Sequence, residues 1–102
     1  MSKEKPTAIF AISDVMALAA MRAIRLEGLR VPDDISVIGF DDIEAAALSD
    51  PPLTTMHVPN YEIGQAAGQM FLDLRNVNCG DRQPMMFKPV LKVRESVMKA
   101  NV

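Results

Sequence analysis

Residues 30–55 of this 102-residue chain, RVPDDISVIGFDDIEAAALSDPPLTT, give the clearest indication of its fold. It opens with the turn-forming sequence VPDD and continues as the apolar strand ISVIGF, residues 35–40. That strand ends on two carboxylates, Asp41 and Asp42. Open α/β sheets bind ligands beyond the carboxyl ends of their strands. The stretch therefore predicts an α/β sheet with a binding site at this edge, and it favours a small-molecule sensor over a catalyst.

Composition narrows the class of protein. A chain of this length is at most one small domain, and 49% apolar with 24% charged residues is ordinary globular composition. The net charge is −2 without a basic block, so we expect no direct contact of this segment with nucleic acid. No apolar run approaches the ~20 residues of a membrane span, and MSKEKPT at the N-terminus does not resemble a signal peptide. Cys79 is the only cysteine, which excludes an internal disulfide.

On either side of residues 30–55, predicted strands and helices alternate. Residues 7–12 (TAIFAI) predict a buried strand. Ser13 is an N-cap candidate for a helix over residues 14–27, which Gly28 ends. A short helix over 43–48, a strand over 53–58, an amphipathic helix over 60–77 and extended structure within 85–97 complete the chain. This order predicts an α/β fold, with a mostly parallel sheet and flanking helices.

The first predicted helix, DVMALAAMRAIRLE, is apolar on most of its circumference. A helix that covers a sheet on one side only shows a wider polar face. We therefore expect one side to pack on the sheet and another to contact a partner. Complete burial within its own domain is the alternative, and it is disfavoured because so small a chain buries little surface.

Polar side chains follow the predicted strands at one edge of the sheet. They are Ser13 with Asp14, Asp41 with Asp42, and His57. Hydroxyl, carboxylate and imidazole groups gathered there are suited to a polar ligand. Each has an alternative reading: Ser13 as an N-cap only, Asp14 as a partner of the helix dipole, and either later aspartate as a cap. His57 could likewise satisfy hydrogen bonds within the protein. Their convergence at one edge favours a joint binding site.

Catalytic and metal-binding patterns are missing from the sequence. There is a single histidine, no G-x-S-x-G serine and no Cys/His cluster with metal-ligand spacing. Gly64 and Gly68 fall inside a predicted helix, where they are expected to allow close packing and not to bind phosphate. We therefore expect neither enzymatic activity nor a metal or cofactor.

Three ordered blocks reveal a family resemblance: PTAIFAISDVMALAAMRAIRLEGLRVPDDISVIGFDD, PPLTTMHVPNYEIGQAA and KVRES. Over residues 6–96 the chain resembles the C-terminal portion of lactose-repressor (LacI) family transcription regulators. The helix-turn-helix headpiece, the hinge and most of the first lobe of such regulators have no counterpart here. The resemblance implies a fragment of a type I periplasmic-binding-protein-like fold, in which two α/β lobes enclose an effector.

The resemblance also implies a division of the chain and a set of effector contacts. Residues 6–58 would form the core of the second lobe, 59–88 would cross to the first lobe, and 89–102 would be a return strand and tail. Many sugar-binding members have Asn where this chain has Ser13, which makes a sugar effector less secure. The expected effector-binding residues are Ser13, Asp14, Asp41 and His57.

A further implication of the resemblance is dimerisation through this lobe. The chain would be a homodimer or higher oligomer, especially since strand 7–12 would lack its upstream neighbour and form an open edge. DNA would be bound only through a helix-turn-helix that this sequence lacks, and such regulators act in the cytoplasm. The predicted dimer interface consists of Leu18, Met21, Arg22, Ala45, Ala46, Ala47 and Leu48.

The function implied is the effector-sensing and dimerising part of a LacI-type regulator. A small metabolite would modulate operator affinity, with a sugar favoured and a nucleobase-like ligand still possible. A fragment of a periplasmic sugar-binding transport protein is the alternative, because such proteins share the fold. The LRVPDDISVIGFDD block favours the regulator.

Overall fold

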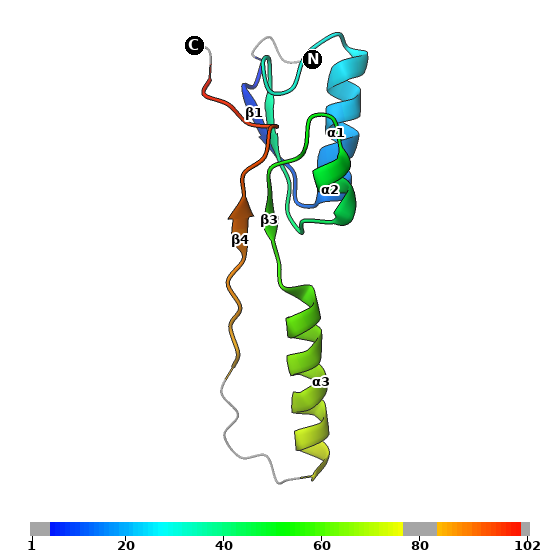
Figure 1. Ribbon diagram of the computed structural model, residues 1–102, viewed down its shortest axis with the longest axis vertical. Helices are drawn as coiled ribbons and strands as arrows, with labels where there is room; N and C mark the ends of the chain where they lie inside the picture. The colour runs from blue at the N-terminus through cyan, green and yellow to red at the C-terminus, as the bar shows by residue number, and fades with distance from the viewer. Residues whose placement is uncertain (1–4, 77–83, 101–102) are drawn as a thin grey trace. The chain divides into compact units, whose positions relative to one another are not determined.

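The computed structural model describes residues 5–76 and 84–100, so the turn that contains Cys79 lies outside the described residues. Strands and helices alternate as the sequence predicts, although every strand is shorter than its apolar run (Figure 1). The chain divides into two compact units, residues 1–57 with 90–102 and residues 58–89. The elements in chain order are β1 (Ala8–Phe10), α1 (Asp14–Leu26), β2 (Ser36–Ile38), α2 (Glu44–Leu48), β3 (Thr55–His57), α3 (Asn60–Asn76) and β4 (Val90–Lys92).

The sheet of the first unit is mostly parallel, as predicted. β1 pairs with β2 in parallel, with Ala8 opposite Ser36. A parallel bridge between Ile38 and Thr54 extends the order from β2 towards β3. β4 pairs with β3 in the antiparallel direction, with His57 opposite Val90. The antiparallel strand belongs to the C-terminal return of the chain, and it forms one edge of an otherwise parallel arrangement.

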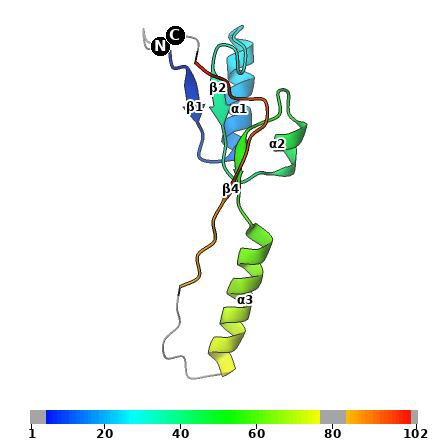
Figure 2. The same ribbon diagram turned by 60° about the vertical axis from the view of Figure 1, so that its left-hand side comes forward.

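Helix α1 begins where its sequence predicts and ends at Leu26, one residue before the predicted end. The Ser13 hydroxyl accepts a hydrogen bond from the Met16 backbone N–H at 3.2 Å, which confirms the N-cap. Gly28 follows the helix with a φ of +79°, a conformation that glycine adopts without steric cost. Both ribbon views show α1 and α2 on the same side of the sheet (Figures 1 and 2). The buried core beneath them consists of Ala11, Ala17, Met21, Ile24, Ile35, Val37, Ala46 and Leu53.

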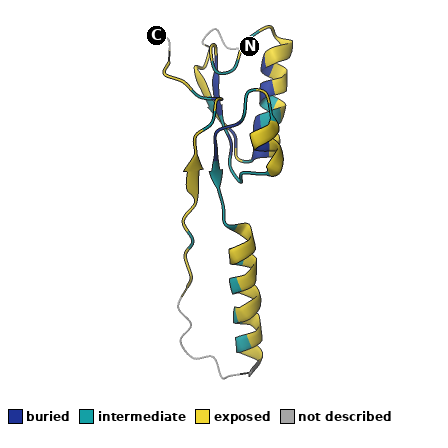
Figure 3. Cartoon of the chain, viewed as in Figure 1, coloured by how far each residue is buried: buried dark blue, intermediate teal, exposed yellow. Residues whose placement is uncertain are grey.

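The prediction that residues 7–12 form a buried strand is wrong in its burial. Ala8 and Phe10 of β1 are exposed, and Phe10 retains 62% of its accessible surface. Figure 3 colours the chain by burial, and the buried residues lie mainly on α1, α2 and the strands beside them. β1 pairs only with β2 among the described strands, and the described residues leave most of its surface uncovered. An apolar run identifies a strand, but only its neighbours decide whether the strand is buried.

The second unit, residues 58–89, contains α3 and the described residues 84–89. Ile63, Ala66 and Met70 lie one helical turn apart and are partly buried, with Met85 and Phe87 lining the same shallow hollow. Phe71 and Leu74 of the predicted apolar stripe remain exposed. The expectation that Gly64 and Gly68 allow close packing is wrong for the described residues, because a Cβ atom at either position would meet nothing within 4 Å.

Candidate functional site

Three chain segments converge at the carboxyl end of the parallel strands. The Asp14 backbone N–H donates to the Phe40 carbonyl at 3.0 Å, which joins the start of α1 to the end of β2. The Asp41 backbone N–H donates to the Met56 carbonyl at 2.9 Å, and Asp41 forms a parallel bridge with His57. These contacts bring the backbones of Ser13, Asp41 and His57 to one edge of the sheet. We call this edge, with Ser13, Asp41 and His57, the rim.

Asp14 has a different position from the other predicted effector contacts. It is completely buried, at 0% exposure. One carboxylate oxygen accepts from the Thr55 hydroxyl at 2.5 Å, and the other accepts from the Ile43 backbone N–H at 2.8 Å. Both oxygens are therefore occupied and shielded from solvent. This burial contradicts direct effector contact by Asp14, which instead fixes the start of α1 against β3 and the turn before α2.

Gly39 makes the position of Asp14 possible. A Cβ atom at Gly39 would collide with the Asp14 carboxylate, and it would also crowd Leu53 at 3.0 Å and Ala17 at 3.3 Å. Glycine is thus required in the G-F-D-D segment because a buried side chain approaches the strand backbone closely. The glycine and the aspartate are 25 residues apart in the sequence, yet each constrains the other.

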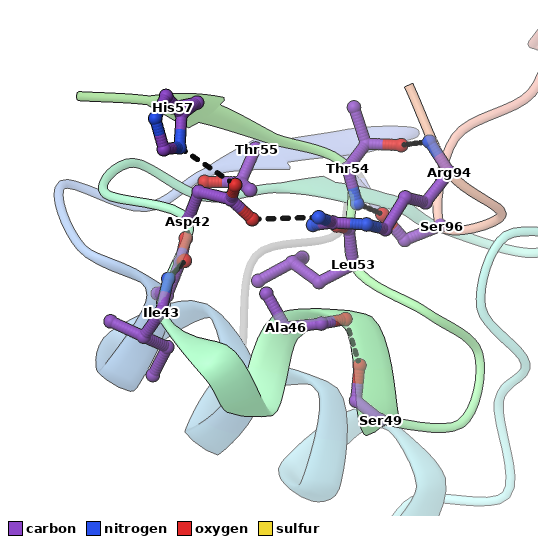
Figure 4. Close-up of polar contacts among 11 residues, drawn as sticks. Asp42, Ile43, Ala46, Ser49, Leu53, Thr54, Thr55, His57, Arg94 and Ser96 are labelled. Carbon is purple, nitrogen blue, oxygen red and sulfur yellow. Dashed lines mark hydrogen bonds and ion pairs between the residues drawn. The ribbon is translucent and has the colours of Figure 1, made fainter. Parts of the chain in front are cut away.

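Asp42 lies at the centre of a polar network beside the rim. One of its carboxylate oxygens is 2.9 Å from Nδ1 of His57, and the other accepts from Nη2 of Arg94 at 2.7 Å (Figure 4). Burial alone would raise the pKa of Asp42. The hydrogen bonds and positive charges of Arg94 and His57 outweigh that effect and hold its pKa below the ordinary value of 3.8. Asp42 is therefore an ionised acceptor near neutral pH.

Arg94 connects this network to the return of the chain after β4. Its Nη1 donates to the Leu53 carbonyl at 2.9 Å, and its backbone N–H donates to the Thr54 hydroxyl at 2.8 Å. Two residues later, the buried Ser96 hydroxyl donates to the Val37 carbonyl and accepts from the Thr54 backbone N–H at 2.8 Å. The KVRES block thus stabilises the strand ends that position the rim.

The turn between β2 and α2 has an unusual backbone. Asp41 has a φ of +130° and Asp42 a φ of +63°, both in the region that side chains disfavour. Asp tolerates the left-handed conformation better than most residues, and such strain costs roughly 1–3 kcal/mol per residue. The strained turn directs Asp42 towards His57 and Arg94. Strained residues of this kind concentrate at ligand sites.

Sequence reasoning missed part of this arrangement. It grouped Asp42 with Asp41 at the strand end but chose only Asp41 as an effector contact, although Asp42 has the two charged partners. It assigned no role to Arg94 or Ser96. The available signal was their presence in a block that carries the family resemblance. Pairing across 52 residues, from Asp42 to Arg94, cannot be inferred from spacing.

Only some residues of the predicted dimer interface are exposed to solvent. Leu48 is 78% exposed, and Arg22 is exposed as well. Met21, at 2% exposure, and Ala46, at 0%, are in the hydrophobic core, because they face the sheet from α1 and α2. Their assignment to an interface is therefore wrong. The residues of the predicted surface that remain accessible are Leu18, Arg22, Ala45, Ala47 and Leu48.

Comparisons with known proteins agree with this architecture. The model of the periplasmic binding protein-like domain matches residues 1–97. The HTH-type transcriptional repressor PurR of Aliivibrio salmonicida is 43% identical over 97 residues, which are 95% of this chain and 29% of the repressor. The chain thus spans less than a third of that relative's length.

Solved structures give the same assignment. The transcriptional regulator CelR in complex with cellobiose matches with a TM-score of 0.84 and 36% identity, over 88% of this chain and 28% of that one. The lac repressor dimer bound to operator and an anti-inducer matches with a TM-score of 0.81 and 38% identity, over 92% of this chain and 32% of that one. The chain belongs to the periplasmic-binding-protein-like domain family, and within it to the effector-binding region of LacI-family transcription regulators.

Within residues 5–76 and 84–100, no helix combines the length and apolarity that crossing a membrane requires. In the same part of the chain, no group of three or more His, Cys, Asp or Glu side chains is arranged to hold a metal ion.

Proposed function

We propose that this chain is the effector-sensing and dimerising part of a cytoplasmic LacI-type repressor, in which a small polar metabolite changes operator affinity. Ser13, Asp41 and His57 are the proposed effector contacts. The observation that supports this most is the convergence of these residues at the carboxyl ends of parallel strands, where Asp42 and Arg94 order the His57 ring. Coupling free energies between two allosteric sites are typically ~1–3 kcal/mol, which is the range expected between effector and operator.

The chemistry of the rim favours a ligand rich in hydroxyl or amine groups. A carboxylate accepts hydrogen bonds, a hydroxyl both donates and accepts, and an imidazole does either according to its protonation. A sugar satisfies this set, and the solved CelR structure, a cellobiose complex, supports a sugar effector. A nucleobase-like ligand with N–H groups is the second possibility. Asp14, Asp42 and Arg94 are proposed to position the contacts without touching the ligand.

The surface proposed for dimerisation consists of Leu18, Arg22, Ala45, Ala47 and Leu48. The small alanine side chains permit close approach of a second copy, and the solved lac repressor is a dimer on its operator. Residues 6–58 and 89–102 are proposed to belong to one lobe of the effector clamshell and residues 59–88 to the other. DNA contact would come from a helix-turn-helix outside the present sequence.

A thermal-shift screen of metabolites on the intact regulator tests the proposal. An effector should raise the melting temperature, and Asp41→Ala should weaken its binding about 10- to 100-fold because one charge-assisted hydrogen bond is lost. Asp33→Ala is the matched control, since it removes an exposed acid whose ion pair is with the exposed Arg30. Full effector affinity in Asp41→Ala would refute the role assigned to that carboxylate.

The periplasmic transport protein is the competing function. The relatives are transcriptional repressors, which favours regulation. An electrophoretic mobility assay of operator DNA with the intact protein distinguishes regulation from transport. If the protein is a regulator, effector should change the fraction of DNA that is bound. An intact protein that binds effector but no DNA would support transport.

A further inference from the structure

Only one ring nitrogen of His57 is hydrogen-bonded to another described residue. Its Nδ1 lies 2.9 Å from a carboxylate oxygen of Asp42, and the side chain is 45% exposed. Within the part of the chain that the structure describes, no hydrogen bond involves the other ring nitrogen, Nε2. The ring therefore has one nitrogen committed to the protein and one available at the rim. A neutral imidazole carries its proton on one nitrogen and accepts with the other, so the committed nitrogen decides what the free one can do.

Asp42, the partner of Nδ1, is held in place as a hydrogen-bond acceptor. The second carboxylate oxygen of Asp42 is bound by Arg94 Nη2 at 2.7 Å, and the guanidinium is itself anchored to the Leu53 carbonyl at 2.9 Å. The Asp42 side chain is 14% exposed, so water competes little for its oxygens. An ionised carboxylate accepts hydrogen bonds and donates none. The nitrogen that faces it must consequently be the donor.

We infer that Asp42, braced by Arg94, is a positioning residue that fixes neutral His57 in its Nδ1-protonated form, so that Nε2 is a hydrogen-bond acceptor for the effector. The inference rests on the proposed function and specifies the ligand chemistry of that site. An effector must present a hydroxyl or N–H group to Nε2. An analogue with an ether oxygen or a carbonyl at that point meets a lone pair and binds about 10-fold or more weakly.

Nitrogen-15 NMR of the imidazole tests the inference directly. His57 is the only histidine, so its two ring nitrogens are assigned without ambiguity. Spectra of the full chain are followed towards alkaline pH until the resonances stop moving, which ensures that the neutral ring is observed. The expected result is a proton on Nδ1 and a bare Nε2. A predominantly Nε2-protonated ring in the wild-type chain overturns the inference, whatever the variants do.

Asp42→Asn keeps the side-chain shape nearly unchanged but should move the His57 proton from Nδ1 to Nε2. Arg94 requires an acceptor, so the amide oxygen should face the guanidinium and the amide NH₂ should face His57. Nδ1 must then accept, and the proton should move to Nε2. Asp33→Asn makes the same chemical change at an exposed site and should leave the wild-type tautomer unchanged. A folded Asp42→Asn variant with the wild-type tautomer would show that Asp42 does not control the ring.

A ligand titration distinguishes failure of this inference from failure of the proposed function. Cellobiose, ribose and adenosine are titrated into the labelled intact regulator, in which the His57 resonances are identified by their loss in His57→Gln. Any probe that binds at the rim should shift the Nε2 resonance more than that of Nδ1. A binder that leaves Nε2 unmoved refutes the acceptor role. If none of the probes binds while Nδ1 is protonated, the result counts against the proposed ligand class, and the positioning by Asp42 is supported.

Discussion

The buried carboxylate of Asp14 offers the most quantitative test of the structure. Asp14→Ala removes the acceptor of two buried donors, the Thr55 hydroxyl and the Ile43 backbone N–H. Each unsatisfied buried donor costs about 1–3 kcal/mol. The sum is about 2–6 kcal/mol, and relief of the desolvation cost of a buried charge offsets part of it. We expect a net loss of about 3 kcal/mol in the free energy of unfolding.

Asp14→Asn should cost less, about 1–2 kcal/mol. The amide oxygen can still accept from Ile43, and the Thr55 hydroxyl can rotate to accept from the amide NH₂. Both hydrogen bonds are retained in neutral form, and the neutral form is roughly half as strong as the charge-assisted one. The order wild type, Asn, Ala in decreasing stability is therefore a specific consequence of the two contacts.

Urea unfolding followed by circular dichroism measures these differences. All variants must be compared at one protein concentration, because self-association contributes to apparent stability. For a chain of about this size, 3 kcal/mol corresponds to a fall in melting temperature of about 12–24 °C. Asp33→Ala, at an exposed ion pair, should remain within about 0.5 kcal/mol of wild type.

Two outcomes would refute this reasoning about Asp14. The first is an Asp14→Ala variant that loses less than about 1 kcal/mol, because the two donors would then find other acceptors. The second is equal destabilisation by Ala and Asn, which would point to packing and not hydrogen bonding as the role of the side chain.

Three further predictions test the surroundings of the site. Gly39→Ala should lower the free energy of unfolding by about 1–3 kcal/mol, since its Cβ would collide with the Asp14 carboxylate. The control Gly64→Ala, in an open helical position, should raise the free energy of unfolding by about 0.5–1 kcal/mol in the same urea titration. The pKa of Asp42 is lower in the folded than in the unfolded chain, so the unfolded chain binds more protons as pH falls. The stability that this residue contributes should be complete well above pH 3.8 and be lost progressively below it, and a difference between wild type and Asp42→Asn that grew on acidification would contradict this. Sedimentation velocity should show the chain as a dimer or larger and Leu48→Glu shifted towards monomer; a compact wild-type monomer at micromolar concentration would count against self-association.

The order of elements could be predicted from sequence because it depends on local signals. Ser13 caps α1 and Gly28 ends it, as their types suggest. The boundaries of β2 were less predictable, since an apolar run of six residues contains a strand of three. Hydrogen bonding to neighbouring strands, which the run itself does not encode, sets those limits.

Burial was predicted less well because it depends on neighbours. Phe10 is exposed although its strand is apolar, and Met21 is buried in the core although the family resemblance implied a place in the dimer interface. Both outcomes follow from where α1 and the sheet meet. A helix with several apolar faces does not reveal in its sequence which face packs on its own sheet.

The alternation of strands and helices, the acidic residues at a strand end and the family resemblance all follow from the amino-acid sequence, because they depend on residue type and local spacing. The roles of the individual aspartates follow only from the folded structure. Asp14 is buried beneath Gly39, while Asp42 lies between His57 and Arg94. The reason is physical: solvation and hydrogen-bond partners set the chemistry of a carboxylate, and residues up to 52 positions away supply those partners here.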